Sequence, residues 1–208
     1  MSELLKSLRY TFYIYSHPFD GFWFMKAQKR GTVKTGIVLM LLLIVTTAVR
    51  IYTTGYIISN VSLTNFSVWL LMLVIVGLVV LYCTANWAFT TLLEGKGSFG
   101  EIFTALMYSF TPVTLINIPM AIISNFITNE ELSFYTFINI AAFGWSILLV
   151  LISNMQIHDY TMTKSILTFI TTLICMVIIV VIGILFINLC QQVYVWILSV
   201  VREISYRI

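Results

Sequence analysis

The sequence Gly95-Lys96-Gly97-Ser98 contains the residue types that end a phosphate-binding loop. Such a loop requires an earlier glycine, and its backbone N–H groups surround the phosphates between a buried strand and a helix. The position of that glycine is Thr90, and an unbroken apolar stretch precedes it in place of a strand. We therefore exclude nucleotide binding and interpret the two glycines as flexible backbone at a bend between two helices.

The two histidines, His17 and His158, and the neighbouring carboxylates, Asp20 and Asp159, have the residue types of a metal site. Their separation along the chain is large, and no H-E-x-x-H motif or cysteine pair accompanies them. We expect no metal and no cofactor, and we expect histidines that form local hydrogen bonds. Together with Lys96, these four residues form a predicted cytoplasmic interaction site.

Pro112, Asn117 and Pro119 form a third candidate constellation. The prolines are seven residues apart, about two helical turns, so they fall on nearly the same helix face. Each proline removes a backbone donor and favours a kink, and transporters use the carbonyls freed in broken helices to bind ions. Because every Asp and Glu lies outside the apolar stretches, a structural kink is the favoured interpretation and a transport site is the alternative.

No other arrangement in the sequence is typical of catalysis. A Ser/Lys pair, a Gly-x-Ser-x-Gly motif and paired intramembrane aspartates are all missing. Cys83, Cys175 and Cys190 have neither zinc-site nor redox spacing, and we interpret them as small hydrophobic residues. No basic face interleaved with aromatic residues predicts nucleic-acid binding. We expect a protein that is not an enzyme and binds no nucleic acid.

The composition indicates which elements must position these residues. Hydrophobic residues make up 60% of the 208 residues and charged residues 9%, compared with about half and about a quarter in soluble proteins. A bilayer core of roughly 30 Å requires about 20 apolar residues per helix. We therefore predict an all-α integral membrane protein with five transmembrane helices, over residues 37–58, 66–91, 102–128, 134–153 and from residue 166 onwards.

The fifth apolar run, residues 166–198, is too long for one crossing. A single tilted helix that ends near Leu189 is the favoured interpretation, because Asn188, Gln191 and Gln192 mark a change of polarity. Two spans are the alternative. The predicted domains are an interfacial arm (1–33), a five-helix transmembrane domain (34–190) and an amphipathic C-terminal tail (191–208).

A few polar residues interrupt the apolar runs. Asn86, Asn139 and Asn188 can form hydrogen bonds between helices. Arg50 lies near the end of the first span, and we expect its long side chain to reach the membrane interface. Ser98 and Glu101 have the spacing of a capping box that starts the third span.

Basic residues are concentrated on one side of the predicted bundle. With five spans, the N-terminal arm and the loops around residues 95 and 158 share a side. That side carries Lys6, Arg9, Lys26, Lys29, Arg30, Lys34, Lys96 and Lys164. The distribution predicts a protein of the cytoplasmic membrane with a cytoplasmic N-terminus and the C-terminus on the opposite side. No cleavable signal peptide is visible.

The arm before the first span has the pattern of two short amphipathic helices. The apolar stripe of the first helix consists of Leu4, Leu5, Leu8, Phe12 and Tyr15. Pro18 ends this helix at His17, and Asp20 is placed to cap a second helix that starts at Gly21. We expect the arm to lie along the lipid headgroups, and a partner-binding surface is the alternative.

Three segments resemble the Yip domain family, named for Ypt-interacting proteins. They are HPFDGFWFMK (17–26), TTLLEGKGSFGEIFTALMYSFTP (90–112) and MQIHDYTMTKSI (155–166). The resemblance covers nearly the whole chain and implies five membrane helices with a cytoplasmic N-terminus. Eukaryotic members act with Rab-type GTPases and carry a longer polar N-terminal extension, so the short arm argues against GTPase binding. The chain is more similar to the compact bacterial members, which are often found beside transporter components.

These observations lead to one leading function and two alternatives. The leading hypothesis is a non-enzymatic polytopic protein that binds or organises another component of the lipid bilayer, such as a transporter subunit. The first alternative is a small transporter or channel that uses the kinked third span. The second is a lipid-handling or membrane-shaping protein that acts through the arm.

Overall fold

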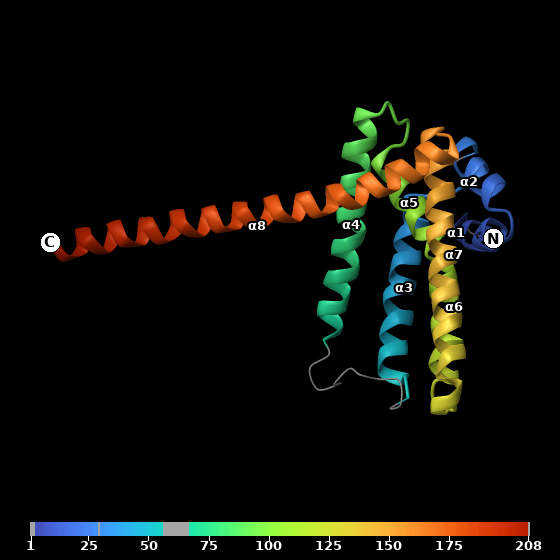
Figure 1. Ribbon diagram of the computed structural model, residues 1–208. Helices are drawn as coiled ribbons and strands as arrows, with labels where there is room; N and C mark the ends of the chain where they lie inside the picture. The colour runs from blue at the N-terminus through green and yellow to red at the C-terminus, as the bar shows by residue number, and fades with distance from the viewer. Residues whose placement is uncertain (1–2, 29, 56–66, 208) are drawn as a thin grey trace.

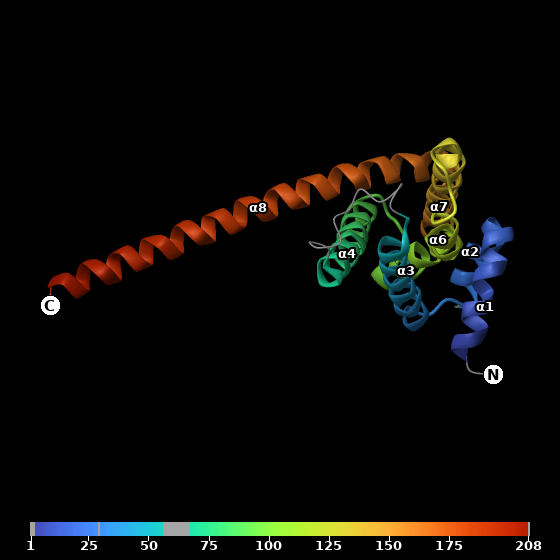
Figure 2. The same cartoon turned by 90° about the horizontal axis from the view of Figure 1, so that it is seen from below.

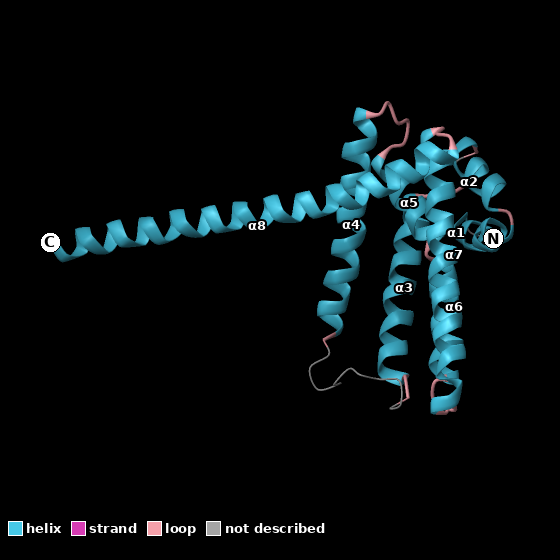
Figure 3. Cartoon of the chain, in the orientation of Figure 1, coloured by secondary structure: helices cyan, strands magenta, loops and turns pink. Residues whose placement is uncertain are grey.

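The computed structural model describes residues 3–28, 30–55 and 67–207, and this part of the chain is helical with short connections (Figure 3). The helices are α1 (Glu3–Ser16), α2 (Pro18–Ala27), α3 (Val33–Thr53), α4 (Val68–Leu92), α5 (Phe99–Ser109), α6 (Thr111–Ile123), the 3₁₀ turn η2 (Asn129–Glu131), α7 (Leu132–His158) and α8 (Met162–Arg207). Five segments are long and apolar enough to cross a membrane: α3, α4, α5 with α6, α7, and α8 as far as Ser199. The all-helical fold with five potential spans that the composition predicted is therefore confirmed.

The third span consists of two helices that meet at Phe110. At its start, the Ser98 N–H donates to Glu101 Oε2 at 2.8 Å and the Glu101 N–H donates to Ser98 Oγ at 3.4 Å, which confirms the predicted capping box. Pro112 lies in the first turn of α6, where its missing N–H leaves no helical bond unmade. It therefore begins a helix after the break instead of kinking a continuous one.

The first part of α8 packs against the bundle and its remainder extends away from it. Figures 1 and 2 show α3, α4, α6 and α7 side by side, with α8 crossing one end and projecting outwards to the C-terminus. Contacts to α4 and α7 bury Ser165, Thr168 and Thr172. From Val177 onwards every described side chain of α8 is exposed.

The arm helices α1 and α2 pack on the bundle. They also present aromatic side chains at the surface. The buried side of α1 consists of Ser7, Tyr10, Thr11 and Ile14. Phe12 of the predicted apolar stripe is 63% exposed. Leu8 of the same stripe is partly buried and packs against the core, whereas Tyr15 is exposed like Phe12. The described part of the stripe is therefore divided between the bundle and the surface.

Specific hydrogen bonds hold the arm on the bundle and hold its two helices together. The Tyr108 hydroxyl, on α5, donates to the Ser7 carbonyl at 3.0 Å, and the Tyr10 hydroxyl donates to the Gly21 carbonyl at 2.7 Å. Burial raises the pKa of Tyr10 to about 12, so the hydroxyl keeps its proton for this bond. A Cβ on Gly21 would lie 2.8 Å from Ile14 Cγ1, so the glycine allows α1 and α2 to approach closely.

The predicted start of the second arm helix is wrong by three residues. The helix α2 begins at Pro18, with His17 in the N-cap position and Asp20 inside the first turn. Proline has a φ angle suited to the first helical position, so it starts α2 as well as ending α1. Phe22 on α2 is fully buried against the bundle, whereas Trp23 is exposed.

Arg50, near the end of α3, contacts two neighbouring helices. Its Nη1 atom donates to Asn117 Oδ1 on α6 at 3.0 Å, and its guanidinium lies 5.8 Å from the ring centroid of Tyr135 on α7. The side chain thus turns towards two neighbouring helices. A buried amide acceptor and an aromatic face replace the water that snorkelling would have provided.

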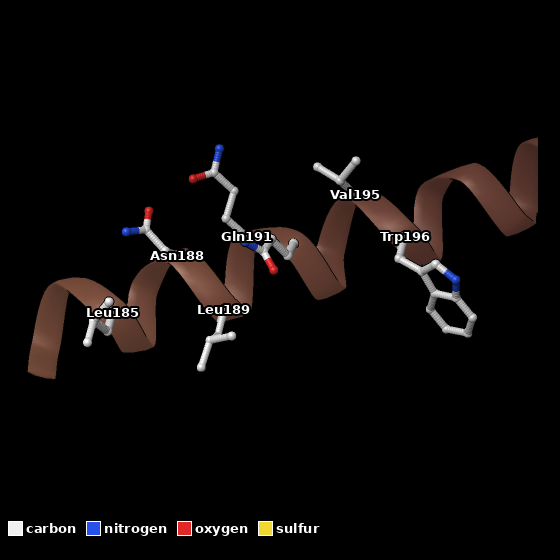
Figure 4. A pocket seen from close by; sticks show the side chains of 7 residues that line it. Leu185, Asn188, Leu189, Gln191, Val195 and Trp196 are labelled. Atoms are coloured by element: carbon white, nitrogen blue, oxygen red, sulfur yellow. The ribbon is translucent and has the colours of Figure 1, made fainter.

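The fifth apolar run lies within one continuous helix, α8, of 46 residues. The expected end of the helix near Leu189 is therefore wrong, because the amide side chains that follow do not interrupt the backbone. At 1.5 Å per residue the length of α8 is about 69 Å, more than twice a bilayer core. Figure 4 shows the stretch from Leu185 to Trp196, where polar Asn188 and Gln191 alternate with Leu189 and Val195 along a single helix. The helix continues through residue 191, and the functional division into arm, transmembrane domain and tail stays a prediction.

Candidate functional site

Three elements distant in sequence meet at the arm end of the bundle. They are α2, the loop 93–98 between α4 and α5, and the turn that joins α7 to α8. We call the group formed by Lys26, Lys96, His158 and Asp159 the Asp159 junction. Of the five residues in the predicted interaction site, the structure brings together Lys96, His158 and Asp159.

The Asp159 carboxylate connects two lysines from different elements. Its Oδ1 lies 3.0 Å from Lys26 Nζ on α2, and its Oδ2 lies 3.1 Å from Lys96 Nζ in the loop. Hydrogen bonds from Lys26 and then Lys96 hold the pKa of the Asp159 carboxyl below its usual value. The carboxylate is therefore ionised at neutral pH and connects the arm to the α4–α5 loop.

The backbone at Asp159 explains how one side chain reaches both partners. Asp159 adopts a left-handed conformation, with φ 54° and ψ 42°, and ends α7. The Tyr160 N–H then donates to the Met155 carbonyl at 2.9 Å. Asp is one of the few residues that tolerate this conformation.

His158 is the buried member of the junction and is 2% exposed. Its Nδ1 accepts from the Gly97 N–H at 3.3 Å, and its Nε2 lies 3.3 Å from Asn86 Oδ1 on α4. A ring with an acceptor at Nδ1 and a donor at Nε2 is the neutral Nε2–H tautomer. His158 thus fixes the position of the loop by its uncharged ring.

The two loop glycines are needed for close approach. Neither has a positive φ; Glu94 does, at 58°. A Cβ on Gly95 would lie 2.6 Å from His158 Nδ1, and one on Gly97 would lie 2.5 Å from Ile157 Cγ2. The predicted bend between two helices is confirmed, and the missing side chains of its glycines matter because the loop packs on His158.

Below His158, amide and hydroxyl side chains join three spans. Asn86 Nδ2 donates to Asn154 Oδ1 at 3.4 Å and to Thr172 Oγ1 at 3.2 Å, and Asn154 Nδ2 donates to the Tyr82 hydroxyl at 3.2 Å. The predicted interhelical role of Asn86 is confirmed. Asn139 instead donates to the Tyr135 carbonyl of its own helix, at 2.7 Å.

A second set of contacts holds the loop against the start of α8. The Tyr160 hydroxyl and Lys164 Nζ both donate to the Leu93 carbonyl, at 3.2 and 3.3 Å. Lys164 Nζ also lies 4.1 Å from the centroid of the Tyr160 ring. The predicted interaction site did not include Lys26, Tyr160 or Asn154. For the first two, the signal was their place inside segments of family resemblance.

The remaining predicted residues lie elsewhere. His17 is exposed at the α1–α2 connection, where it contacts Ser16 Oγ and stacks on Tyr13. Asp20 is exposed on α2. In the described part of the chain, His, Cys, Asp and Glu side chains do not gather in a group of three or more that could hold a metal ion.

The three residues of the predicted kink have different surroundings. Asn117 is buried, and its Nδ2 donates to Thr46 Oγ1 at 3.3 Å and to Thr47 Oγ1 at 3.2 Å. Pro112 is buried, whereas Pro119 is exposed, although both lie on α6.

Part of the Asp159 junction is exposed. Asp159 is shared by Lys26 and Lys96, whereas His158 binds the Gly97 N–H and Asn86. The side chains of Lys96 and Asp159 are 68% and 50% exposed. Exposed Phe19 and Trp23 lie on the adjacent α2. This end of the molecule therefore presents both charge signs beside aromatic side chains.

Comparison with known families identifies the chain. The family described as the Yip1 domain matches residues 12–185, which include the four residues of the Asp159 junction. No curated protein and no solved structure matches the chain. The match confirms the resemblance that the three segments indicated. The chain is a multi-span membrane protein that belongs to the Yip1 domain family.

Proposed function

We propose that this protein binds or organises another membrane component, such as a transporter subunit, and does so without catalysis. Members of the Yip1 domain family are generally non-enzymatic membrane proteins. The observation that carries the proposal is the projecting part of α8. It is the longest helix, and the bundle covers only its beginning.

The side chains of α8 favour another protein helix as its partner. Asn188, Gln191 and Gln192 lie within an otherwise apolar stretch and are exposed. Amide side chains on membrane helices form hydrogen bonds to neighbouring helices, because lipid offers them no partner. We call these three residues the amide stripe. A partner helix that carries amide or hydroxyl side chains would satisfy it.

The membrane and the orientation form part of the same proposal. We place the protein in the cytoplasmic membrane, with its N-terminus and the Asp159 junction on the cytoplasmic side. Lys26 and Lys96 of the junction and the basic arm support this orientation. A polybasic surface also attracts anionic headgroups of the cytoplasmic leaflet.

Site-specific photocrosslinking in membranes tests the proposal. A photoreactive amino acid replaces Gln191 in the amide stripe or, as control, Leu78, which is exposed on α4. We expect a crosslinked multi-span membrane protein from position 191 and none from position 78. Crosslinking only to a second copy of this chain, or equal products from both positions, would contradict the proposal. Purification in mild detergent gives a second check, because recovery of the chain alone argues against a stable partner.

A transporter or channel is the first alternative. It is supported by a cavity of about 110 Å³ that Arg50, Asn117 and Asn139 help to line beside the third span. Reconstituted vesicles that show no more flux of ions and small solutes than empty vesicles would exclude it.

A lipid-handling or membrane-shaping protein is the second alternative. It is supported by the exposed aromatic side chains of the arm, including Phe12, Phe19 and Trp23. Replacement of Leu8 and Phe12 by Asp should abolish any effect of the protein on vesicle shape. An unchanged effect would exclude this function.

A further inference from the structure

Arg50 is a cation placed between three helices, at the end of the bundle opposite the Asp159 junction. It lies three residues before the end of α3 at Thr53, which is about 4.5 Å along the helix axis. This depth corresponds to the headgroup boundary of a bilayer that α3 crosses. Its guanidinium nevertheless points to Asn117 and Tyr135 of the neighbouring helices.

Among the described residues, no carboxylate forms an ion pair with Arg50. Both ion pairs of the described residues involve Asp159, at the other end of the bundle. The segment 56–66 contains no acidic residue. A partly buried charge without a counterion is costly, since the hydration that it loses is not replaced.

Most of the hydrogen-bonding capacity of Arg50 is also unused. A guanidinium has five N–H donors, and within the described residues one bond is made, to Asn117 Oδ1. Beside it, Tyr135 is buried, and its hydroxyl has no hydrogen-bond partner in the described part of the chain. Arg50 thus keeps unused N–H donors, and the Tyr135 hydroxyl beside it has no partner among the described residues.

A cavity lies next to these donors. Its volume is about 110 Å³, and it is lined by Arg50 of α3, Asn117 and Val113 of α6, and Asn139 and Phe143 of α7, among others. This volume corresponds to roughly three or four water molecules. It is sufficient for a compact group with several oxygen atoms, and its apolar walls limit access of bulk water.

We propose that this cavity is a binding site for a phosphate group, held by the Arg50 guanidinium between α3, α6 and α7. The planar fork of arginine fits phosphate oxygens in pairs, which matches the unused donors. Two sources share this chemistry: the headgroup of an anionic phospholipid, and free inorganic phosphate. The inference does not depend on the proposed partner of α8, because the two sites involve different residues.

Thermal unfolding of the full chain in neutral detergent tests the site. The probes are phosphatidylglycerol, phosphatidylcholine and inorganic phosphate. The variants are Arg50→Gln, which removes the charge, and Arg9→Gln, which removes an exposed charge on α1. We expect phosphatidylglycerol to raise the Tm of the wild type and of Arg9→Gln by several degrees more than phosphatidylcholine does, and we expect Arg50→Gln to lose this difference. An equal shift from inorganic phosphate identifies the free anion as the ligand.

Lipid retention measured by native mass spectrometry provides a second readout if Arg50→Gln does not fold. Val113→Phe fills the cavity and keeps the arginine. We expect it to retain several-fold less phosphatidylglycerol, or phosphate, than the wild type. The proposal is overturned if the wild type does not prefer either phosphate probe to phosphatidylcholine, or if Val113→Phe retains as much of it as the wild type.

Discussion

The Nδ1 atom of His158 accepts a hydrogen bond from the backbone N–H of Gly97 at 3.3 Å, across 61 positions of sequence. This contact holds the α4–α5 loop on the end of α7. Because Asp159 follows His158 and binds Lys26 and Lys96, the position of the loop and the position of the arm are fixed at neighbouring residues.

Replacement of Gly97 by alanine should destabilise the protein. The added Cβ would lie 2.5 Å from Ile157 Cγ2 and 2.7 Å from His158 Cε1, so the loop must move away. We expect a loss of about 1–3 kcal/mol, typical of overpacking, measured by unfolding in detergent. Gly77→Ala is the matched control, because a Cβ there meets nothing within 4 Å. Equal stability of the two variants would show that the loop does not pack on His158 as described.

Removal of the His158 imidazole should be far more costly than removal of the other histidine. His158→Leu leaves Asn86 Oδ1 and the Gly97 N–H without partners, which should cost about 1–3 kcal/mol. His17 is exposed, so His17→Leu should change the free energy of unfolding by less than about 0.5 kcal/mol. Denaturation of both variants beside the wild type measures the difference.

The ion pairs of Asp159 should make the stability of the protein depend on pH in the acidic range. The folded state lowers the pKa of this carboxyl through Lys26 and Lys96. The pairs therefore stabilise the protein above the unfolded pKa of about 3.9, and this contribution disappears as the pH falls through the lower folded pKa.

Comparison of Asp159→Asn with the wild type between pH 7 and pH 3 tests this dependence. At neutral pH we expect the variant to be less stable by about 1 kcal/mol or less, because the pairs are largely exposed. The difference should shrink as the pH falls. Asp20→Asn is the control, since Asp20 forms no ion pair within the described residues. A difference that is constant with pH would mean that the charge of Asp159 is not involved.

Truncation of two side chains in the arm should distinguish a residue that packs on the bundle from one that is exposed. Ile14 is fully buried against the bundle, so Ile14→Ala should cost about 2–4 kcal/mol. Phe12 is exposed two positions earlier, so Phe12→Ala should leave the unfolding free energy in detergent nearly unchanged. Equal losses for both variants would contradict the docked position of α1.

Local patterns were sufficient to predict much of the architecture. The apolar runs predicted five helices long enough to cross a membrane, and Ser98 with Glu101 predicted the start of the third. The segments around Gly97 and His158 also indicated the family. These features could be predicted because each depends on residues within a few turns of one another.

The candidate site could be predicted only in part. His158, Asp159 and Lys96 were named from the sequence, but Lys26 was not, and His17 and Asp20 were placed in a site from which they are separated. Lys26 precedes Asp159 by more than a hundred positions, so their contact depends on how α2 packs on α7. The same holds for Arg50, whose direction depends on whether a neighbouring helix offers an acceptor.

The sequence by itself determined that this protein is helical and that its helices are surrounded by lipid. A lipid environment requires long apolar segments whose backbone groups are paired internally. Only the tertiary structure decided which face of the arm is buried, why the loop has glycines, and which charges meet. Those outcomes depend on close packing between helices. The hydrophobic periodicity of a single helix does not specify its distance from another helix.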